Sequence, residues 1–251
     1  MSKPVRPRRR PQPKRRVAPD TSAPLTLAID TSGAVESLAL VQGGLVLADQ
    51  RARRPRRRGT ALGVAIDRLL ASVGRAPADL AAISVGLGPG AFTGLRVGIS
   101  TARGMARALD IPLYGFDSTL GLACAAFGHD VVVVLDARRD EVYVARYAAA
   151  ADPASLPTPE HATRLESPED LAASLVDAPS RLLVGDGARL YADQLLAAAP
   201  QHRIGTLEPG GAALGAVARD AARRLAADER PALASVVPLY LRDHDAAQRA
   251  R

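Results

Sequence analysis

The stretch LTLAIDTSGAVESLALVQ, residues 25–42, sets a pattern that the chain uses twice. The apolar run Leu25–Ile29 predicts a buried strand that ends on Asp30, and a second strand follows after a polar turn. Residues 130–148, DVVVVLDARRDEVYVARYA, repeat this order with Asp136 at the strand end. The recurrence predicts an α/β protein of two duplicated halves, each a mixed sheet with helices packed on it.

The rest of the chain divides around these two halves. We expect a disordered basic tail over residues 1–24, a first half over 25–125, a second half over 126–242 and a flexible C-terminus over 243–251. Apolar positions at helical spacing predict further helices. The main ones are expected at Thr60–Val73, Thr93–Leu109, Pro168–Leu175 and Gly211–Ala227.

Composition narrows the class of protein. The chain has 251 residues, of which 47% are hydrophobic, enough for a real core. No apolar run reaches the ~20 residues of a membrane-spanning helix. The single cysteine, Cys124, excludes an internal disulfide and is expected to be a small buried hydrophobe, so a reducing cytoplasm is the expected compartment.

The net charge of +7 lies in the tail. Residues 1–24 hold eight Lys or Arg and one Asp, whereas the remainder holds 25 basic and 25 acidic residues. The tail is rich in proline and has almost nothing to bury, so we expect it to be disordered. Two roles stay open for it, electrostatic RNA binding and a solvated extension without a role.

The glycine-rich stretch VGLGPGAFTGLRVGISTARGMARALDIPL, residues 85–113, allows three interpretations. Gly86, Gly88 and Ala91 match a dinucleotide fingerprint, but no acid-ended strand follows about twenty residues on. A phosphate-binding P-loop needs a lysine after its last glycine, and the chain has none beyond Lys14. The third interpretation is close packing.

Small residues recur along the helix in this stretch. Glycine inside a helix costs ~1 kcal/mol relative to alanine, so a close contact is expected in return. We expect Thr93 to cap the helix and its small residues to let another helix approach. The main stripe is Gly94, Gly98, Ala102 and Ala106, and Gly104 and Ala108 form a neighbouring one.

Four segments carry a resemblance to a known family. LAIDTS, GLGPGAFTGLRVGISTARGMA, LDARRDEVYVARY and PLYLR resemble the TsaB (YeaZ) family over about Leu25 to Arg242. The resemblance implies the actin/Hsp70/sugar-kinase (ASKHA) fold. It also implies a non-catalytic subunit that binds and activates the TsaD transferase, which threonylcarbamoylates adenosine 37 of ANN-decoding tRNAs.

The same resemblance implies partners. TsaD pairs with this family through the N-terminal helices, a TsaE-type ATPase joins a larger complex, and tRNA is contacted indirectly. A homodimer through the same surface is a further expectation, and no membrane is involved. The alternative is that both helices simply cover their own sheet. The expected interface residues are Leu62, Ile66, Thr93, Gly94, Arg96, Val97, Gly98, Thr101, Ala102 and Met105.

Catalytic residues are not expected. TsaD holds its metal with two histidines four residues apart, and no two of the four histidines here, His129, His161, His202 and His244, have that spacing. In the superfamily, an Asp at the end of each first strand organises phosphate and Mg²⁺. A vestigial nucleotide site with weak ATP or ADP binding is therefore one interpretation, and turn capping is the other. The residues concerned are Asp30, Thr31, Ser32, Asp136, Gly185 and Gly187.

A different class of function stays open beside the scaffold, namely a stand-alone nucleotide hydrolase or peptidase-like protein. The chain also departs from the family in its basic tail and in the six arginines between Arg51 and Arg58. These arginines either touch tRNA phosphates or form a solvated loop. Gly59 or Thr60 stands where many members have a histidine-containing stretch.

Overall fold

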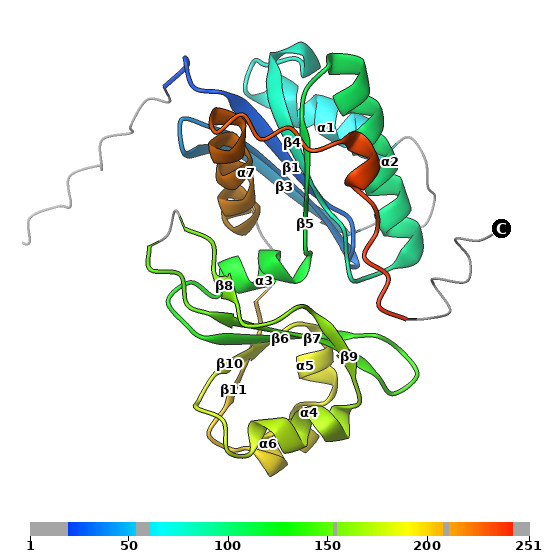
Figure 1. Cartoon of the computed structure of the whole chain (residues 1–251), viewed down its shortest axis with the longest axis vertical. Coiled ribbons are helices and arrows are strands. Elements are labelled where there is room, and N and C mark those ends of the chain that lie inside the picture. The colour runs from blue at the N-terminus through cyan, green and yellow to red at the C-terminus, as the bar shows by residue number, and fades with distance from the viewer. Residues whose placement is uncertain (1–19, 54–60, 153–154, 208–210, 243–251) are drawn as a thin grey trace, which may run out of the picture.

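The computed structural model describes residues 20–53, 61–152, 155–207 and 211–242, which form two halves stacked along the long axis (Figure 1). The sheet of the first half has the strand order β3-β2-β1-β4-β5. Its central strand pairs antiparallel with β2 and parallel with β4, and every residue of it is buried because helices cover both faces. The strands are β1 (Leu25–Asp30), β2 (Val35–Gln42), β3 (Leu45–Arg53), β4 (Leu80–Gly86) and β5 (Leu113–Phe116).

The sheet of the second half repeats this topology. Its order is β11-β10-β6-β7-β8, with β9 also paired to β7. The strand β6 pairs antiparallel with β7 and parallel with β10, as β1 does with β2 and β4. The predicted α/β fold of two duplicated halves, each a mixed sheet with helices packed on it, is confirmed. The strands are β6 (Val131–Asp136), β7 (Val142–Ala148), β8 (Thr158–Pro159), β9 (Arg164–Glu166), β10 (Leu182–Val184) and β11 (Arg203–Gly205).

Helices cover both faces of the first sheet. The helices α1 (Ala61–Ser72) and α2 (Phe92–Leu109) enclose the larger core on one face, and α7 (Gly211–Ala226) covers the other. Ala91 is the N-terminal cap of α2 and makes no side-chain capping bond. The prediction that Thr93 caps this helix is therefore wrong, and Thr93 lies in its first turn.

The second sheet is covered by shorter helices. On its outer face lie α4 (Pro168–Leu175), α5 (Asp186–Leu190) and α6 (Ala192–Ala198). The short helix α3 (Thr119–Ala125) packs on its inner face and also contacts α7, so it lies between the halves (Figure 1).

The last helix returns to the first half. Leu214 and Val217 of α7 are buried against β1 and β2, and the hydroxyl of Thr26 donates to the carbonyl of Ala218 at 2.9 Å. The prediction that residues 126–242 form the second half is therefore corrected, because α7 packs on the first half. The apolar face of α7 finds its buried surface on the first sheet, so the chain crosses back at residue 211.

Other predictions fall at the borders of the described ranges. The tail was expected through residue 24, but residues 20–24 are described, and the Gln42 amide donates to the carbonyl of Ala23 at 2.9 Å. Residues 1–19, 54–60 and 243–251 lie outside the described residues, and with them most of the Arg51–Arg58 run. Two short 3₁₀ helices, Pro77–Asp79 and Leu233–Ser235, complete the elements. Of the helices described, none is long and apolar enough to cross a membrane.

Candidate functional site

The carboxyl group of Asp30 is enclosed at the end of β1. Its side chain is 4% exposed, and one of its oxygens accepts the N–H of Ser32 at 2.7 Å. A Cβ atom at Gly86 of β4 would lie 2.9 Å from Asp30 Cγ and 2.6 Å from Ser118 Oγ. Burial raises the pKa of Asp30, and the nearby carboxylate of Asp117 adds to the effect.

The two residues after Asp30 hold the glycine-rich stretch. The hydroxyl of Thr31 donates to the carbonyl of Gly94 in α2 at 2.8 Å, and the carbonyl of Ser32 accepts the N–H of Ala91 at 2.7 Å. A Cβ atom at Gly90 would lie 2.5 Å from the Ser32 carbonyl oxygen, so no other residue fits there. The stretch is therefore a packing device within the chain.

The main stripe of small residues on α2 faces the chain's own sheet. All four of its members are buried, and a Cβ atom at Gly98 would lie 2.2 Å from Thr31 Oγ1. Leu62 and Ile66 of α1 are buried in the same core. The interface prediction is therefore corrected for five of its ten residues, which the monomer already buries. These are Leu62, Ile66, Gly94, Gly98 and Ala102.

The other five predicted interface residues keep part of their surface. Arg96 is exposed, and its guanidinium lies 4.9 Å from the centre of the Phe92 ring. The remaining four are half-buried. They are Thr93, Val97, Thr101 and Met105.

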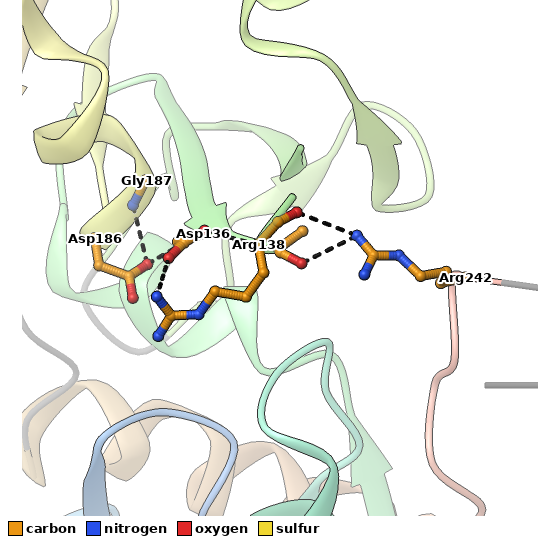
Figure 2. A network of polar contacts seen from close by, with 6 residues as sticks. Asp136, Arg138, Asp186, Gly187 and Arg242 are labelled. Carbon is orange, nitrogen blue, oxygen red and sulfur yellow. Dashed lines mark hydrogen bonds and ion pairs between the residues drawn. The ribbon is translucent and has the colours of Figure 1, made fainter. Parts of the chain in front are cut away.

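A second polar cluster surrounds Asp136 at the end of β6 (Figure 2). One carboxylate oxygen of Asp136 accepts the N–H of Arg138 at 2.7 Å, and the other pairs with the Arg138 guanidinium at 2.9 Å. Asp186 in turn accepts the N–H groups of Asp136 and Gly187, both at 3.0 Å. The Asp136 carboxylate is thus engaged by an arginine of its own turn.

The two glycines beside Asp186 are explained by packing. Gly185 has φ +113°, and a Cβ atom there would lie 2.2 Å from the carbonyl oxygen of Val134. A Cβ atom at Gly187 would lie 2.8 Å from the carbonyl carbon of Leu135. Both glycines therefore let the start of α5 approach the end of β6.

The turn between β6 and β7 has an uncommon backbone. Arg138, Arg139 and Asp140 have φ values of 64°, 58° and 55° in succession. Each non-glycine residue in this left-handed region costs roughly 1–2 kcal/mol, so the surroundings must hold the turn. Arg242 from the C-terminal segment contributes: it donates to the carbonyls of Ala137 and Arg138 at 3.0 and 3.3 Å. Figure 2 shows Arg242 beside Arg138, and Arg242 also pairs with the Glu141 carboxylate.

A further polar network ties the two halves together. Asp117 accepts the N–H and hydroxyl of Thr119 at 2.8 and 2.6 Å and the hydroxyl of Thr163 at 2.5 Å. The Thr119 oxygen lies 2.7 Å from the Tyr147 hydroxyl, which donates because the Thr119 hydrogen is already engaged. Burial raises the pKa of Tyr147 well above its ordinary value, so the phenol stays neutral.

Sequence reasoning missed several of these residues. Asp117 also bonds the nearby Thr119, but its contact with Thr163 and that of Ser118 with Gly88 come from distant segments, which no local pattern predicts. Arg242 had one signal, its place in the PLYLR segment that resembles the family.

The remaining titratable side chains do not form a metal site. Within the described ranges, no group of three or more His, Cys, Asp or Glu is placed to hold a metal ion. The buried ring of His202 accepts the N–H of Arg181 and lies 3.0 Å from the carbonyl of Leu175, which is a structural role. Burial raises the pKa of Cys124 to about 12, so its thiol is unreactive at neutral pH.

The two glycines of α2 offer a matched test of which face is buried. Gly98→Ala should lower the free energy of unfolding by about 1–3 kcal/mol, because the new methyl group meets Thr31. Gly104→Ala should raise it by up to ~1 kcal/mol, because nothing lies within 4 Å of that position. Urea denaturation of both variants checks this, and equal effects of the two would contradict the orientation of α2.

The raised pKa of Asp30 makes a prediction with a definite sign. Between the ordinary value of 3.8 and the raised value, the folded state binds more protons than the unfolded state. The unfolding free energy of the wild type should therefore increase, relative to Asp30→Asn, as the pH falls through this window, by at most about 1.4 kcal/mol per pH unit. Urea denaturation of both proteins from pH 8 to pH 4.5 measures the difference. If the unfolding free energy of the wild type instead increases relative to Asp30→Asn as the pH rises, the carboxylate is stabilised by a cation.

Comparison with known proteins places this geometry in a family. The family model for TsaD, described as tRNA N6-adenosine threonylcarbamoyltransferase, matches residues 55–249. The chain is 35% identical over 123 residues to the tRNA threonylcarbamoyladenosine biosynthesis protein TsaB of Bacillus subtilis, covering 48% of this chain and 54% of that protein. It is 41% identical over 128 residues to an uncharacterized protein of Mycobacterium tuberculosis, covering 48% and 58%. The matched segment thus spans little more than half the length of these relatives.

A solved structure extends the likeness over most of the fold. YeaZ from Pseudomonas aeruginosa superposes with a TM-score of 0.71 at 28% identity, covering 87% of this chain and all of that one. With its repeated Asp-ended strands, its glycine-rich packing loop and these relatives, the chain belongs to the TsaB (YeaZ) family of tRNA threonylcarbamoyladenosine biosynthesis proteins.

Proposed function

We propose that the chain is a non-catalytic subunit that binds and activates a TsaD-type transferase, through the outer face of α1 and α2. The observation that carries the proposal is a pair of exposed glycines inside these helices. Among the described residues, no atom outside the helix itself lies within 4 Å of a Cβ atom added at Gly63 or at Gly104, so no described contact explains either glycine, although glycine in a helix interior costs ~1 kcal/mol. A second chain that approaches these positions closely would account for both.

The residues beside these glycines fit a docking face. Val64 is 43% exposed on α1. On α2, Val97 and Thr101 are half-buried and lie about three turns and about two turns before the exposed Ala108, so these three residues share one side of the helix. The helices α1 and α2 contact each other, so their outer residues form one continuous surface. We call this surface the α1–α2 face; it comprises Gly63, Val64, Val97, Thr101, Gly104 and Ala108.

The polar clusters support a role without catalysis in this chain. The Asp30 carboxyl is enclosed by Ser32, Gly86 and Ser118, and the Asp136 carboxylate is paired with Arg138. Neither is presented to a substrate, which favours a partner subunit over a stand-alone hydrolase. In the same proposal a TsaE-type ATPase and tRNA join through the transferase, and two copies of this chain pair through the α1–α2 face when the transferase is absent.

The face can be tested with a bulky residue at a position that the monomer leaves open. Gly104→Leu should weaken binding to the TsaD-type transferase of the same organism by about tenfold or more, because the side chain separates the two surfaces. The unfolding free energy should not fall, since the position is open in the monomer. Titration calorimetry and light scattering of the mixture provide the measurement.

Ala198→Leu is the matched control, because Ala198 is an exposed small residue on a helix of the other half. It should leave the affinity unchanged. Normal affinity of the Gly104→Leu variant would contradict the proposed face.

A further inference from the structure

The segment Leu233–Arg242, here called the C-terminal strap, begins in the first half. Val236 is 3% exposed and, with Leu233, packs into the core beneath α1 and α2. The N–H of Leu239 donates to the carbonyl of Leu87, just after β4, at 2.7 Å. Figure 1 shows the strap in red, passing beside α2 and descending toward the second half.

The middle of the strap is fixed to the first turn of α2. The ring of Tyr240 lies against that of Phe92, the first residue of α2, with ring centres 5.6 Å apart. The guanidinium of Arg96 lies 4.9 Å from the centre of the same Phe92 ring. Three residues of two segments thus form one small stack at the N-terminal end of α2.

The end of the strap reaches the second half. Arg242 donates to two carbonyl oxygens of the turn between β6 and β7, beside Arg138 (Figure 2). It also pairs with the carboxylate of Glu141. Its side chain is 18% exposed, so these contacts are partly shielded from water. Only one residue, Leu241, separates the contact on α2 from the contact on the turn.

We propose that the C-terminal strap ties the left-handed turn of the second half to the start of α2, with Arg242 as the positioning residue. Three consecutive left-handed residues are not maintained by local preference. The strap adds a constraint to the hydrogen bonds within the turn, from a segment more than a hundred residues away, and it fixes the exposed Arg138, Arg139 and Asp140 relative to α2.

This tie has a consequence for docking, which rests on the proposed function. The stack of Phe92, Tyr240 and Arg96 lies at the first turn of α2, the helix that carries part of the α1–α2 face, and Arg242 two residues on contacts the turn. Holding them together presents a partner with one rigid surface made by both halves, so less freedom is lost on binding. The strap itself is tested without any partner, so the failure of one proposal is distinguishable from the failure of the other.

Hydrogen–deuterium exchange of the full chain tests the strap. Three amides of the turn are hydrogen-bonded: Ala137 to the Glu141 carbonyl, Arg138 to the Asp136 carboxylate, and Glu141 to the Arg138 carbonyl. Arg242→Ala should accelerate their exchange about tenfold or more, because the carbonyls and the carboxylate lose their donor. Arg242→Lys should restore part of the protection, since an ammonium group can still pair with Glu141.

Two controls separate positioning from general stability. Arg230→Ala removes another arginine of the same C-terminal region, which pairs with the exposed Asp228, and should leave the turn unchanged. Leu195→Ala removes a fully buried side chain from the core on the outer face of the second sheet. It should accelerate exchange in that core rather than selectively in the turn. The proposal is overturned if the amides of the turn exchange equally fast in the wild type and in Arg242→Ala. It is also overturned if Arg242→Ala accelerates exchange as widely over the second half as Leu195→Ala does.

Tyr240→Ala tests the connection to α2. Releasing the strap from Phe92 should accelerate exchange of the turn about threefold or more, because the strap then holds Arg242 less firmly. Acceleration confined to the start of α2 would overturn the coupling while leaving Arg242 as a local contact only.

Discussion

The contact between α2 and the end of β1 is the constraint on which the rest of this half depends. A helix can approach a strand end this closely only where it has no side chain, and Gly98 meets that condition against Thr31. The hydroxyl of Thr31 then bonds the carbonyl of Gly94, and the carbonyl of Ser32 bonds the N–H of Ala91. The LAIDTS strand and the glycine-rich stretch are therefore two sides of one interface.

The chain also engages both strand-end carboxyl groups, for which the sequence left nucleotide binding and turn capping open. At the first strand end, the Asp30 carboxyl is buried between hydroxyl groups, and burial raises its pKa. At the second, the Arg138 guanidinium pairs with the Asp136 carboxylate at 2.9 Å. Both strand-end carboxyl groups thus have partners within the chain.

Much of the fold could be predicted because its signals are local. Apolar runs that end on Asp30 and Asp136 identified both central strands, and periodic apolar residues located the long helices. The orientation of the small residues on α2 could not be predicted in this way. Spacing of three or four residues places Gly94 and Gly98 on one face, but it does not say whether the neighbour is the chain's own sheet or another protein. The exposed Gly104 has the same local signal as the buried Gly98.

Long-range contacts were the other limit of prediction. The hydroxyl of Thr26 bonds the carbonyl of Ala218, 192 residues away, and Arg242 bonds the turn at Ala137. No periodicity records such pairings, so the return of α7 to the first sheet and the strap emerged only from the structure. The pairing of Asp136 with Arg138 could not be predicted either, because it depends on the left-handed turn. Residue types alone do not say whether that carboxylate pairs with an arginine or binds a cation.

A tRNA modification assay separates a structural from a catalytic role for the two strand-end carboxylates. The full chain carrying Asp30→Asn and Asp136→Asn is combined with the TsaD-type transferase of the same organism, after circular dichroism and calorimetry have shown that it folds and binds. A subunit that acts by docking should support modification within about twofold of the wild-type rate. A loss of about a hundredfold or more, with folding and binding intact, would mean that these carboxylates take part in the reaction.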